Sequence, residues 1–125
     1  MRTTAVVLAA GQGTRMRSEL PKVLHPLLGH PLAWYALEAA RQATHSRPVM
    51  VIGHAAGQVR QALGEAAQYV VQEPQLGTGH AVMQAETLLS GNTDRVLVTY
   101  ADMPLVTAET LSSLVTSQET HSGPI

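Results

Sequence analysis

The stretch TTAVVLAAGQGTRM, residues 3–16, decides the fold class of this chain. Residues 3–10 form a continuous apolar run with β-branched members, which is typical of a strand buried on both faces. Gly11 and Gly13 end the run in a loop. Glycine loops that follow strands commonly hold phosphates, because a residue without a side chain lets backbone N–H groups approach an anion closely.

Strand and helix patterns alternate along the rest of the chain. Residues 49–52, 68–72 and 96–100 are predicted strands; residues 32–43, 57–63, 78–89 and a segment capped by Thr107 are predicted helices. Residues 11–28 are a predicted loop, and Pro31 opens the first helix. The apolar helix positions expected to face the core are Ala33, Leu37, Ala40, Ala81, Val82, Ala85, Leu88, Leu111, Leu114 and Val115. The order βαβαβαβα predicts an α/β fold with an open, mostly parallel, Rossmann-like sheet and helices on both faces.

Composition excludes several classes of function. The 125 residues are 45% hydrophobic and 14% charged, with a net charge of −1, so no basic field favours a nucleic-acid partner. The absence of cysteine excludes disulfides, cysteine-ligated zinc and a thiol nucleophile. The six histidines lack the spacing of a metal site. No signal peptide or membrane span can be identified, so we expect a cytoplasmic protein without a membrane partner.

The glycine loop GQGTRM differs from the known phosphate loops. It lacks the GxxxxGK[ST] pattern of a P-loop. It is a poor dinucleotide fingerprint because Met16 stands at the third glycine and no acid follows Ile52 to hold a ribose. The remaining reading is a loop whose backbone approaches phosphate, with Arg15 adding a planar fork of donors. The alternative is an ordinary turn between a strand and a helix.

Two charged residues are rare types in this chain. Lys22 is its one lysine, and Asp102 is one of two aspartates, the other being Asp94. A lysine near the loop can follow a phosphate as a point charge, and a carboxylate at the end of a buried strand can hold Mg²⁺. The alternatives are a solvated surface lysine and an aspartate that caps a turn.

The segment QEPQLGTGHA, residues 72–81, follows the third predicted strand and opens a helix. The amides of Gln72 and Gln75 offer a donor and an acceptor together, as reading the edge of a base requires. The alternative is a glycine-rich helix entry, and His80 is interpreted as structural. These features together suit direct phosphoryl or nucleotidyl transfer: a loop for phosphate, a lysine, two amides and a carboxylate.

The segment LAAGQGTRMRSELPKVLHPLLGHP, residues 8–31, resembles the LAAGxGTRM…PK signature of nucleoside-triphosphate-dependent sugar-phosphate nucleotidyltransferases. LPKVLH and QLGTGHA are more specific and resemble the N-acetylglucosamine-1-phosphate uridyltransferases within that family. The resemblance covers the whole chain. It implies a nucleotide-diphospho-sugar transferase fold and a reaction in which UTP and N-acetylglucosamine 1-phosphate give UDP-N-acetylglucosamine and pyrophosphate.

The resemblance also implies roles for individual residues. Arg15 and Lys22 would be catalytic, Gln72 and the Gly77 backbone would read uracil, and Asp102 would bind Mg²⁺. The residues that would bind substrate are Leu8, Ala9, Ala10, Gly11, Gly13, Thr14, Arg15, Lys22, Gln72, Gln75, Gly77, Thr78, Tyr100 and Ala101.

The chain departs from the family pattern in two ways. Ala101 stands where the family usually has glycine, and its methyl group could crowd the sugar. The family's domain is nearly twice as long, and a second metal ligand comes later in it. Residues 1–125 are therefore expected to be the nucleotide-binding half of the domain, truncated at the start of a fifth strand.

Alternatives to the uridyltransferase reading stay open. The chain could be another sugar-phosphate or molybdopterin nucleotidyltransferase, or an inactive nucleotide-binding fragment. An unpaired strand edge also favours self-association into a homo-oligomer.

Overall fold

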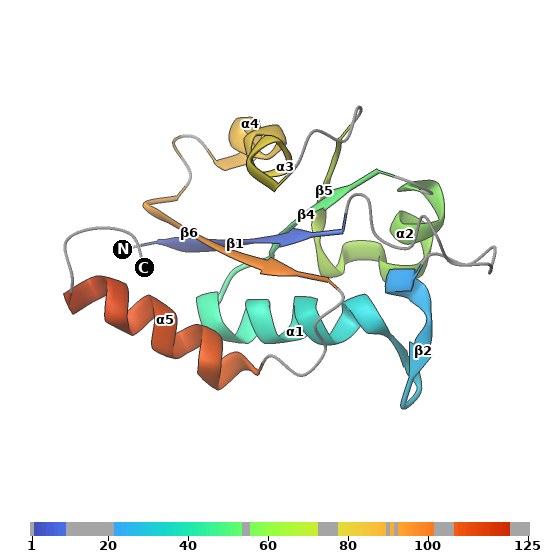
Figure 1. The fold of residues 1–125 in the computed structure, drawn as a ribbon, viewed down its shortest axis with the longest axis horizontal. Coiled ribbons are helices and arrows are strands. Elements are labelled where there is room, and N and C mark those ends of the chain that lie inside the picture. The colour runs from blue at the N-terminus through green and yellow to red at the C-terminus, as the bar shows by residue number, and fades with distance from the viewer. Residues whose placement is uncertain are drawn as a thin grey trace.

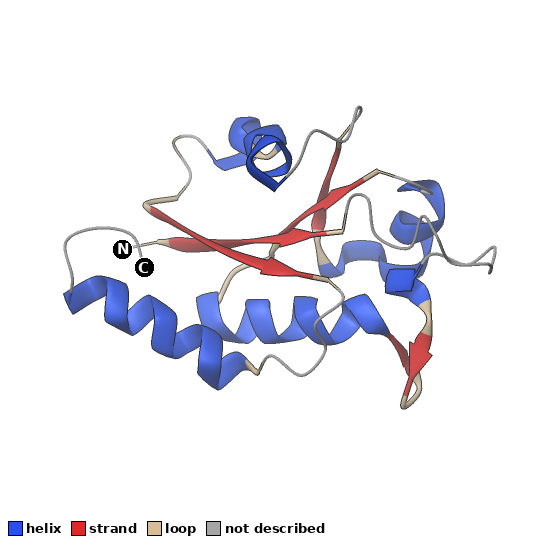
Figure 2. Cartoon of the chain, in the orientation of Figure 1, coloured by secondary structure: helices blue, strands red, loops and turns tan. Residues whose placement is uncertain are grey.

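A computed structural model of the chain describes residues 2–9, 22–53, 56–72, 78–89, 91, 93–101 and 107–120. The described part has three layers, with one four-stranded sheet between helices on its two faces (Figure 1). Figure 2 shows the same arrangement by element type. The predicted α/β architecture is therefore confirmed.

The sheet contains the four predicted strands, all of them parallel. They are β1 (Thr3–Leu8), β4 (Val49–Ile52), β5 (Gln68–Val71) and β6 (Arg95–Tyr100), in the spatial order β5-β4-β1-β6. The chain proceeds outward from β1 to β5 and then crosses back to place β6 on the other side of β1. The order therefore reverses between β1 and β6, and ligands of open α/β sheets bind at such a switch point, beyond the carboxyl ends of the strands.

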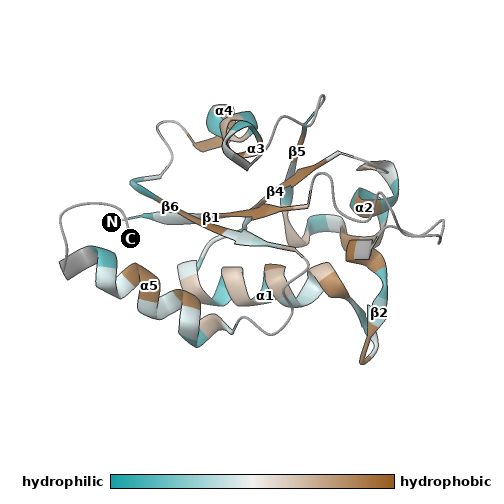
Figure 3. Cartoon of the chain, in the orientation of Figure 1, coloured by the Kyte–Doolittle hydropathy of each residue, from teal (hydrophilic) through white to brown (hydrophobic). Residues whose placement is uncertain are grey.

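Two hydrophobic cores lie on opposite faces of the sheet. Ala5 and Val7 face a core shared with α1 (Leu32–Thr44), α2 (Ala56–Leu63) and α5 (Ala108–Thr120). Val6 and Leu8 face a second core with α3 (Thr78–Gln84) and α4 (Glu86–Leu89). β1 is thus buried on both faces, as its unbroken apolar sequence predicts. In Figure 3 the apolar colour is concentrated in β1 and β4.

The region predicted as one loop up to residue 28 contains regular structure in its described part. A short 3₁₀ helix, η1 (Lys22–Leu24), leads into a hairpin of β2 (Pro26–Leu27) and β3 (His30–Pro31). Leu28 (φ 50°) and Gly29 (φ 89°) form its two-residue turn, and the Tyr35 hydroxyl donates to the carbonyl of Leu27. Strands of two residues show no periodicity, so the sequence gives no signal for them.

Several helix predictions need correction in detail. Pro31 is extended (ψ 148°) and lies at the N-cap of α1 rather than in its first turn. The helix predicted over residues 78–89 is interrupted at Ala85, and a 3₁₀ turn, η2 (Gly64–Ala66), follows α2. Thr107 caps α5 as predicted, because its hydroxyl accepts the N–H of Thr110 at 3.2 Å.

Two burial predictions are wrong. Leu114 of α5 is 41% exposed, whereas Leu111 is buried. β6, predicted as a buried strand, leaves Val96 and Val98 about 40% exposed on one face. β6 is the last strand on its side of the described sheet, and its other face, with Leu97, packs against α1 and α5. No helix within the described ranges is long and apolar enough to cross a membrane.

Candidate nucleotide site at the carboxyl edge of the sheet

The carboxyl ends of β1 and β6 lie side by side. Leu8 and Tyr100, the last residues of these strands, are in register. The ladder continues for one more bond, since the N–H of Ala101 donates to the carbonyl of Leu8 at 3.0 Å. Four residues predicted to bind substrate, Leu8, Ala9, Tyr100 and Ala101, are therefore brought together at the switch point of the sheet.

Gln72 lies on the same edge, two strands away from β1. Its backbone N–H donates to the carbonyl of Ile52 at 2.7 Å, and the N–H of Ala9 donates to the carbonyl of Val51 at 2.9 Å. β4 thus acts as the spacer between Ala9 and Gln72. The edge presents the ends of all four strands in one row, so the sequence-predicted residues of β1, β5 and β6 share one face of the molecule.

The side chain of Gln72 is 3% exposed and bonded to a neighbouring helix. Its Nε2 lies 2.9 Å from Nδ1 of His80, in the first turn of α3. The other ring nitrogen of His80 lies 3.2 Å from Nε2 of Gln84, one turn further along. From the sequence, His80 is interpreted as structural but has no named partner; its spacing of four from Gln84 is the one available signal.

Ala101 is completely buried and belongs to the core beneath the sheet, on the side of α1 and α5. Its methyl group therefore packs against other apolar side chains. From the sequence, this methyl group was expected to crowd the sugar. In the structure it fills volume in the hydrophobic core instead. Tyr100, by contrast, is 37% exposed at the edge.

Lys22 begins η1, directly before two residues that are firmly anchored. Val23 and Leu24 are 2% and 6% exposed and belong to the core on the side of α1. The backbone at Lys22 is therefore held against the core, as the backbone at Ala9 is held by β4.

Thr78, another residue predicted to bind substrate, is the first residue of α3.

The remaining predicted site residues lie outside the described part of the chain. They are Ala10, Gly11, Gly13, Thr14, Arg15, Gln75, Gly77 and Asp102. Asp102 directly follows Ala101 in the sequence. Among the residues that the structure describes, no group of three or more histidine, aspartate or glutamate side chains could hold a metal ion.

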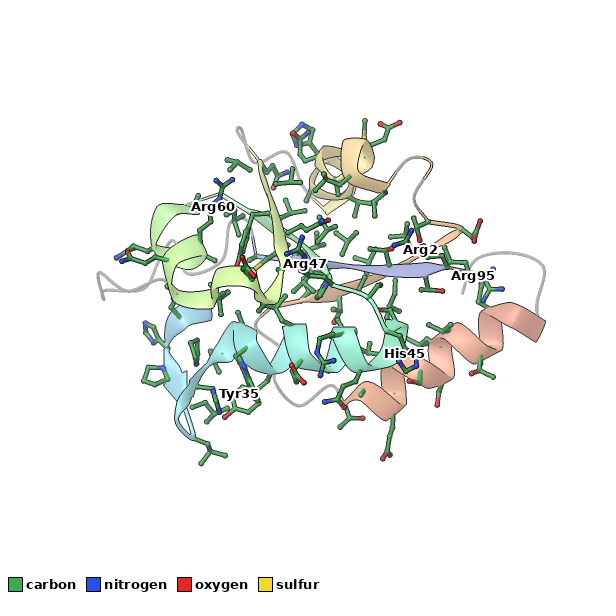
Figure 4. The ribbon with its side chains drawn as sticks, turned by 180° about the vertical axis from the view of Figure 1, so that it is seen from behind. Arg2, Tyr35, His45, Arg47, Arg60 and Arg95 are labelled. Carbon is green, nitrogen blue, oxygen red and sulfur yellow. The ribbon has the colours of Figure 1, made fainter. Side chains whose placement is uncertain are left out.

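A recess of about 430 Å³ lies at the opposite, amino edge of the sheet. Arg2, Arg47 and Gln68 are among the residues that line it, and Figure 4 shows the two arginines. Arg47 lies just beyond the C-terminus of α1, which ends at Thr44. At the same edge Asp94 accepts the backbone N–H of Arg2 at 2.8 Å. This hydrogen bond connects the segments that precede β1 and β6 at the amino edge, whereas ligands of open α/β sheets bind at the other edge.

Two ionisable groups with shifted pKa values lie away from the carboxyl edge. Burial raises the pKa of Tyr69, in the amino-terminal half of β5, and the nearby Arg60 and Arg47 partly offset that shift. The hydrogen bond from Arg41 lowers the pKa of Glu38 on the outer surface of α1. Neither group bears on the candidate site.

Comparison with known proteins defines the class of this domain. A family model for the MobA-like NTP transferase domain matches residues 5–125. The chain therefore belongs to the MobA-like NTP transferase domain family and is a nucleotidyltransferase domain. Among curated relatives it is similar to the bifunctional protein GlmU of Exiguobacterium sp. AT1b, with 46% identity over all 125 residues. The chain spans 28% of the length of that protein.

Solved structures share the fold. Rv0371c of Mycobacterium tuberculosis H37Rv, crystallised in complex with manganese, superposes with a TM-score of 0.78 and 26% identity, over 96% of this chain and 61% of that chain. A nucleotidyl transferase from Methanothermobacter thermautotrophicus, Mth528, has a TM-score of 0.79 and 27% identity, over 92% of this chain and 57% of that chain. These likenesses confirm the nucleotide-diphospho-sugar transferase type of fold.

Proposed function

We propose that the carboxyl edge of this sheet binds UTP and that the chain is the nucleotide-binding half of an N-acetylglucosamine-1-phosphate uridyltransferase. The observation that carries the proposal is the bond between Ala101 and Leu8, which joins the strand before the glycine loop to the strand before Asp102. The similarity to bifunctional protein GlmU over the whole chain supports the choice of substrates.

The proposed reaction is an in-line displacement. An oxygen of N-acetylglucosamine 1-phosphate forms a bond to the α-phosphorus of UTP, and the bond from that phosphorus to the oxygen bridging to the β-phosphate breaks. The products are UDP-N-acetylglucosamine and pyrophosphate. Arg15 would stabilise the departing pyrophosphate and Lys22 the charge on the reacting phosphate, which is how proteins mainly assist such transfers.

Asp102 is the proposed ligand of a divalent cation. Mg²⁺ binds through one or two carboxylates and keeps its remaining positions for water and substrate phosphates, so a single aspartate beside a triphosphate site is a suitable donor. The bound ion would neutralise phosphate charge. The manganese complex of Rv0371c supports a divalent metal in this fold.

The remaining residues of the edge would hold the nucleoside. In this proposal Leu8 and Ala9 lie against it, Gln72 reads uracil, and Tyr100 lines the cleft toward the sugar. Because the chain spans 28% of the length of its relative, the isolated 125 residues are proposed to bind nucleotide with weak or no turnover. Robust formation of UDP-N-acetylglucosamine by the purified chain, measured through the release of pyrophosphate, would contradict that assignment.

Calorimetric titration with UTP, CTP, GTP and ATP in the presence of MgCl₂ tests the nucleotide. UTP is expected to bind at least about tenfold more tightly than the others, because a site built to hydrogen-bond one base leaves buried polar groups unpaired with another. The match to a MobA-like domain favours a second candidate, a nucleotidyltransferase that uses a different triphosphate. Equal or tighter binding of GTP or CTP would select that candidate.

A further inference from the structure

The recess at the amino edge of the sheet is lined mainly by groups that suit an anion. Its volume of about 430 Å³ is within the range of small-molecule sites, which is roughly 300–1,000 Å³. Val49 and Leu88, which belong to or pack against the second core, supply its apolar lining. The polar residues that line it in the described part of the chain include no aspartate or glutamate; they are Arg2, Thr4, Ser46, Arg47 and Gln68.

The backbone of Arg2 is fixed by the segment that leads into β6. Its N–H donates to the carboxylate of Asp94 at 2.8 Å, and its carbonyl accepts the N–H groups of Asp94 and Arg95 at 2.8 and 3.1 Å. The hydroxyl of Thr93 donates to the same carbonyl at 3.0 Å. A ligand that binds the Arg2 side chain therefore has little backbone entropy to remove.

The backbone beside Arg47 is fixed as well, and the same contacts relate it to Arg2. The hydroxyl of Ser46 donates to the carbonyl of Thr3 at 3.0 Å, so the residues next to the two arginines are bonded to each other. On the other side, Pro48 is fully buried and its carbonyl accepts the N–H of Gln68 at 2.9 Å. The two arginines thus extend from anchored backbones at one edge of the sheet (Figure 4).

Side-chain cations are what an anion site at this edge requires. Helix N-termini attract anions, whereas α1 ends at Thr44 beside the amino edge, and the dipole at that end opposes an anion. Within the part of the chain that the structure describes, neither Arg2 nor Arg47 forms an ion pair; the pair seen there joins Arg41 to Glu38. Both guanidinium groups of the recess are therefore available to a ligand from solution.

We propose that this recess is a second anion site, which binds the phosphate group of a small phosphate ester. A phosphate dianion matches two guanidinium forks in charge and in number of oxygens, and Thr4 and Gln68 can donate further hydrogen bonds. The described lining offers no aromatic ring on which a base could stack, so a small ester is expected rather than a nucleotide. The proposal does not rest on the nucleotide site at the carboxyl edge.

Three variants of the 125-residue chain test the proposal. Arg2→Gln and Arg47→Gln each remove one charge from the recess and keep a polar side chain of similar reach. Arg60→Gln is the matched control, because Arg60 is exposed on the neighbouring surface of α2, over the ring of Tyr69, and does not line the recess. Thermal melts establish that each variant is folded.

The measurement is a titration followed in ¹H–¹⁵N spectra, which locates each binding event. The probes are inorganic phosphate, glycerol 3-phosphate and sodium acetate, with NaCl at matched ionic strength as the reference. Saturable shifts are expected for the amides of Arg2, Thr4, Arg47 and Gln68 with the two phosphates, and not with acetate or chloride. Arg2→Gln and Arg47→Gln should each weaken glycerol 3-phosphate binding about tenfold, through the loss of a charge-assisted contact, and Arg60→Gln should leave it unchanged.

The outcomes separate the two proposals. A wild-type chain without saturable shifts at these amides would overturn the second site, whether or not the variants fold. Equal shifts with acetate or chloride, or an equal loss in Arg60→Gln, would also overturn it. Shifts confined to the amides of Ala9 and Ala101 would overturn the second site and leave the proposed nucleotide site intact. Binding of phosphate in the recess by a chain that does not bind UTP would support the second site and contradict the proposed function.

Discussion

The N–H of Ala101 donates to the carbonyl of Leu8 at 3.0 Å, which places the methyl group of Ala101 in the core below the sheet. The resemblance described in the sequence analysis implies glycine at this position. Because the methyl is completely buried, replacing it should change packing far more than nucleotide binding.

Ala101→Gly is therefore expected to lower the free energy of unfolding by about 1 kcal/mol, through the lost methyl and the added chain entropy. Ala101→Val should cost about 1–3 kcal/mol through overpacking. Urea denaturation measures both, and UTP affinity of the glycine variant should stay within about twofold of wild type. A large gain in UTP affinity for Ala101→Gly would mean that the methyl faces the ligand.

Lys22 and Arg47 provide a test of which edge of the sheet binds the triphosphate. Replacing either residue with alanine removes one positive charge. Lys22 directly precedes Val23 and Leu24, which are buried in the core, whereas Arg47 lines the recess at the amino edge. Lys22→Ala is expected to weaken UTP binding about tenfold by removing a charge-assisted contact. Arg47→Ala should leave it unchanged. The opposite result would move the nucleotide to the amino edge.

Leu37 and Leu114 form a matched pair on two packed helices. Leu37 of α1 is 2% exposed in the core, and Leu114 of α5 is 41% exposed. Leu37→Ala should destabilise the fold by about 2–5 kcal/mol, since it leaves a cavity. Leu114→Ala should cost less than about 0.5 kcal/mol. Similar losses of unfolding free energy in the two variants would contradict the packing of α5.

The exposed face of β6 predicts self-association of the isolated chain. Val96 and Val98 are apolar and about 40% exposed on the last strand of the described sheet, where apolar edges promote pairing between molecules. Sedimentation velocity should show dimers that increase with concentration, and Val98→Lys should reduce them. Gln61→Lys, an equal charge change on the exposed surface of α2, is the control. A wild-type chain that stays monomeric at high concentration would refute the prediction.

The sequence predicts the strands well because burial on two faces leaves an unmistakable apolar run, as in residues 3–10. It predicts the exposure of β6 poorly, because the composition of Val96 to Tyr100 is similar to that of the buried strand in residues 3–10. In addition, the order of the strands in the sheet is not encoded in any one segment. The β2–β3 hairpin is too short for periodicity. Tertiary contacts between residues eight apart, such as Gln72 and His80, have no local signature at all.

The part of the site that could be predicted follows from one geometric rule. Residues just after parallel strands meet at one edge, so Ala9, Gln72 and Ala101 could be expected to share that edge before the structure was known. What the rule cannot supply is the state of each side chain. The burial of the Ala101 methyl and the orientation of the Gln72 amide depend on which helix covers them.

β1 sends alternate side chains into two separate cores, with Ala5 and Val7 on one face and Val6 and Leu8 on the other. Sliding this strand by one position would exchange all four environments together, and it would also carry the carbonyl of Leu8 away from Ala101. The alignment of the proposed substrate-binding edge is consequently set by the same packing that keeps the domain folded. A substitution that lets β1 shift is expected to disable the proposed nucleotide site without altering any residue proposed to touch the nucleotide.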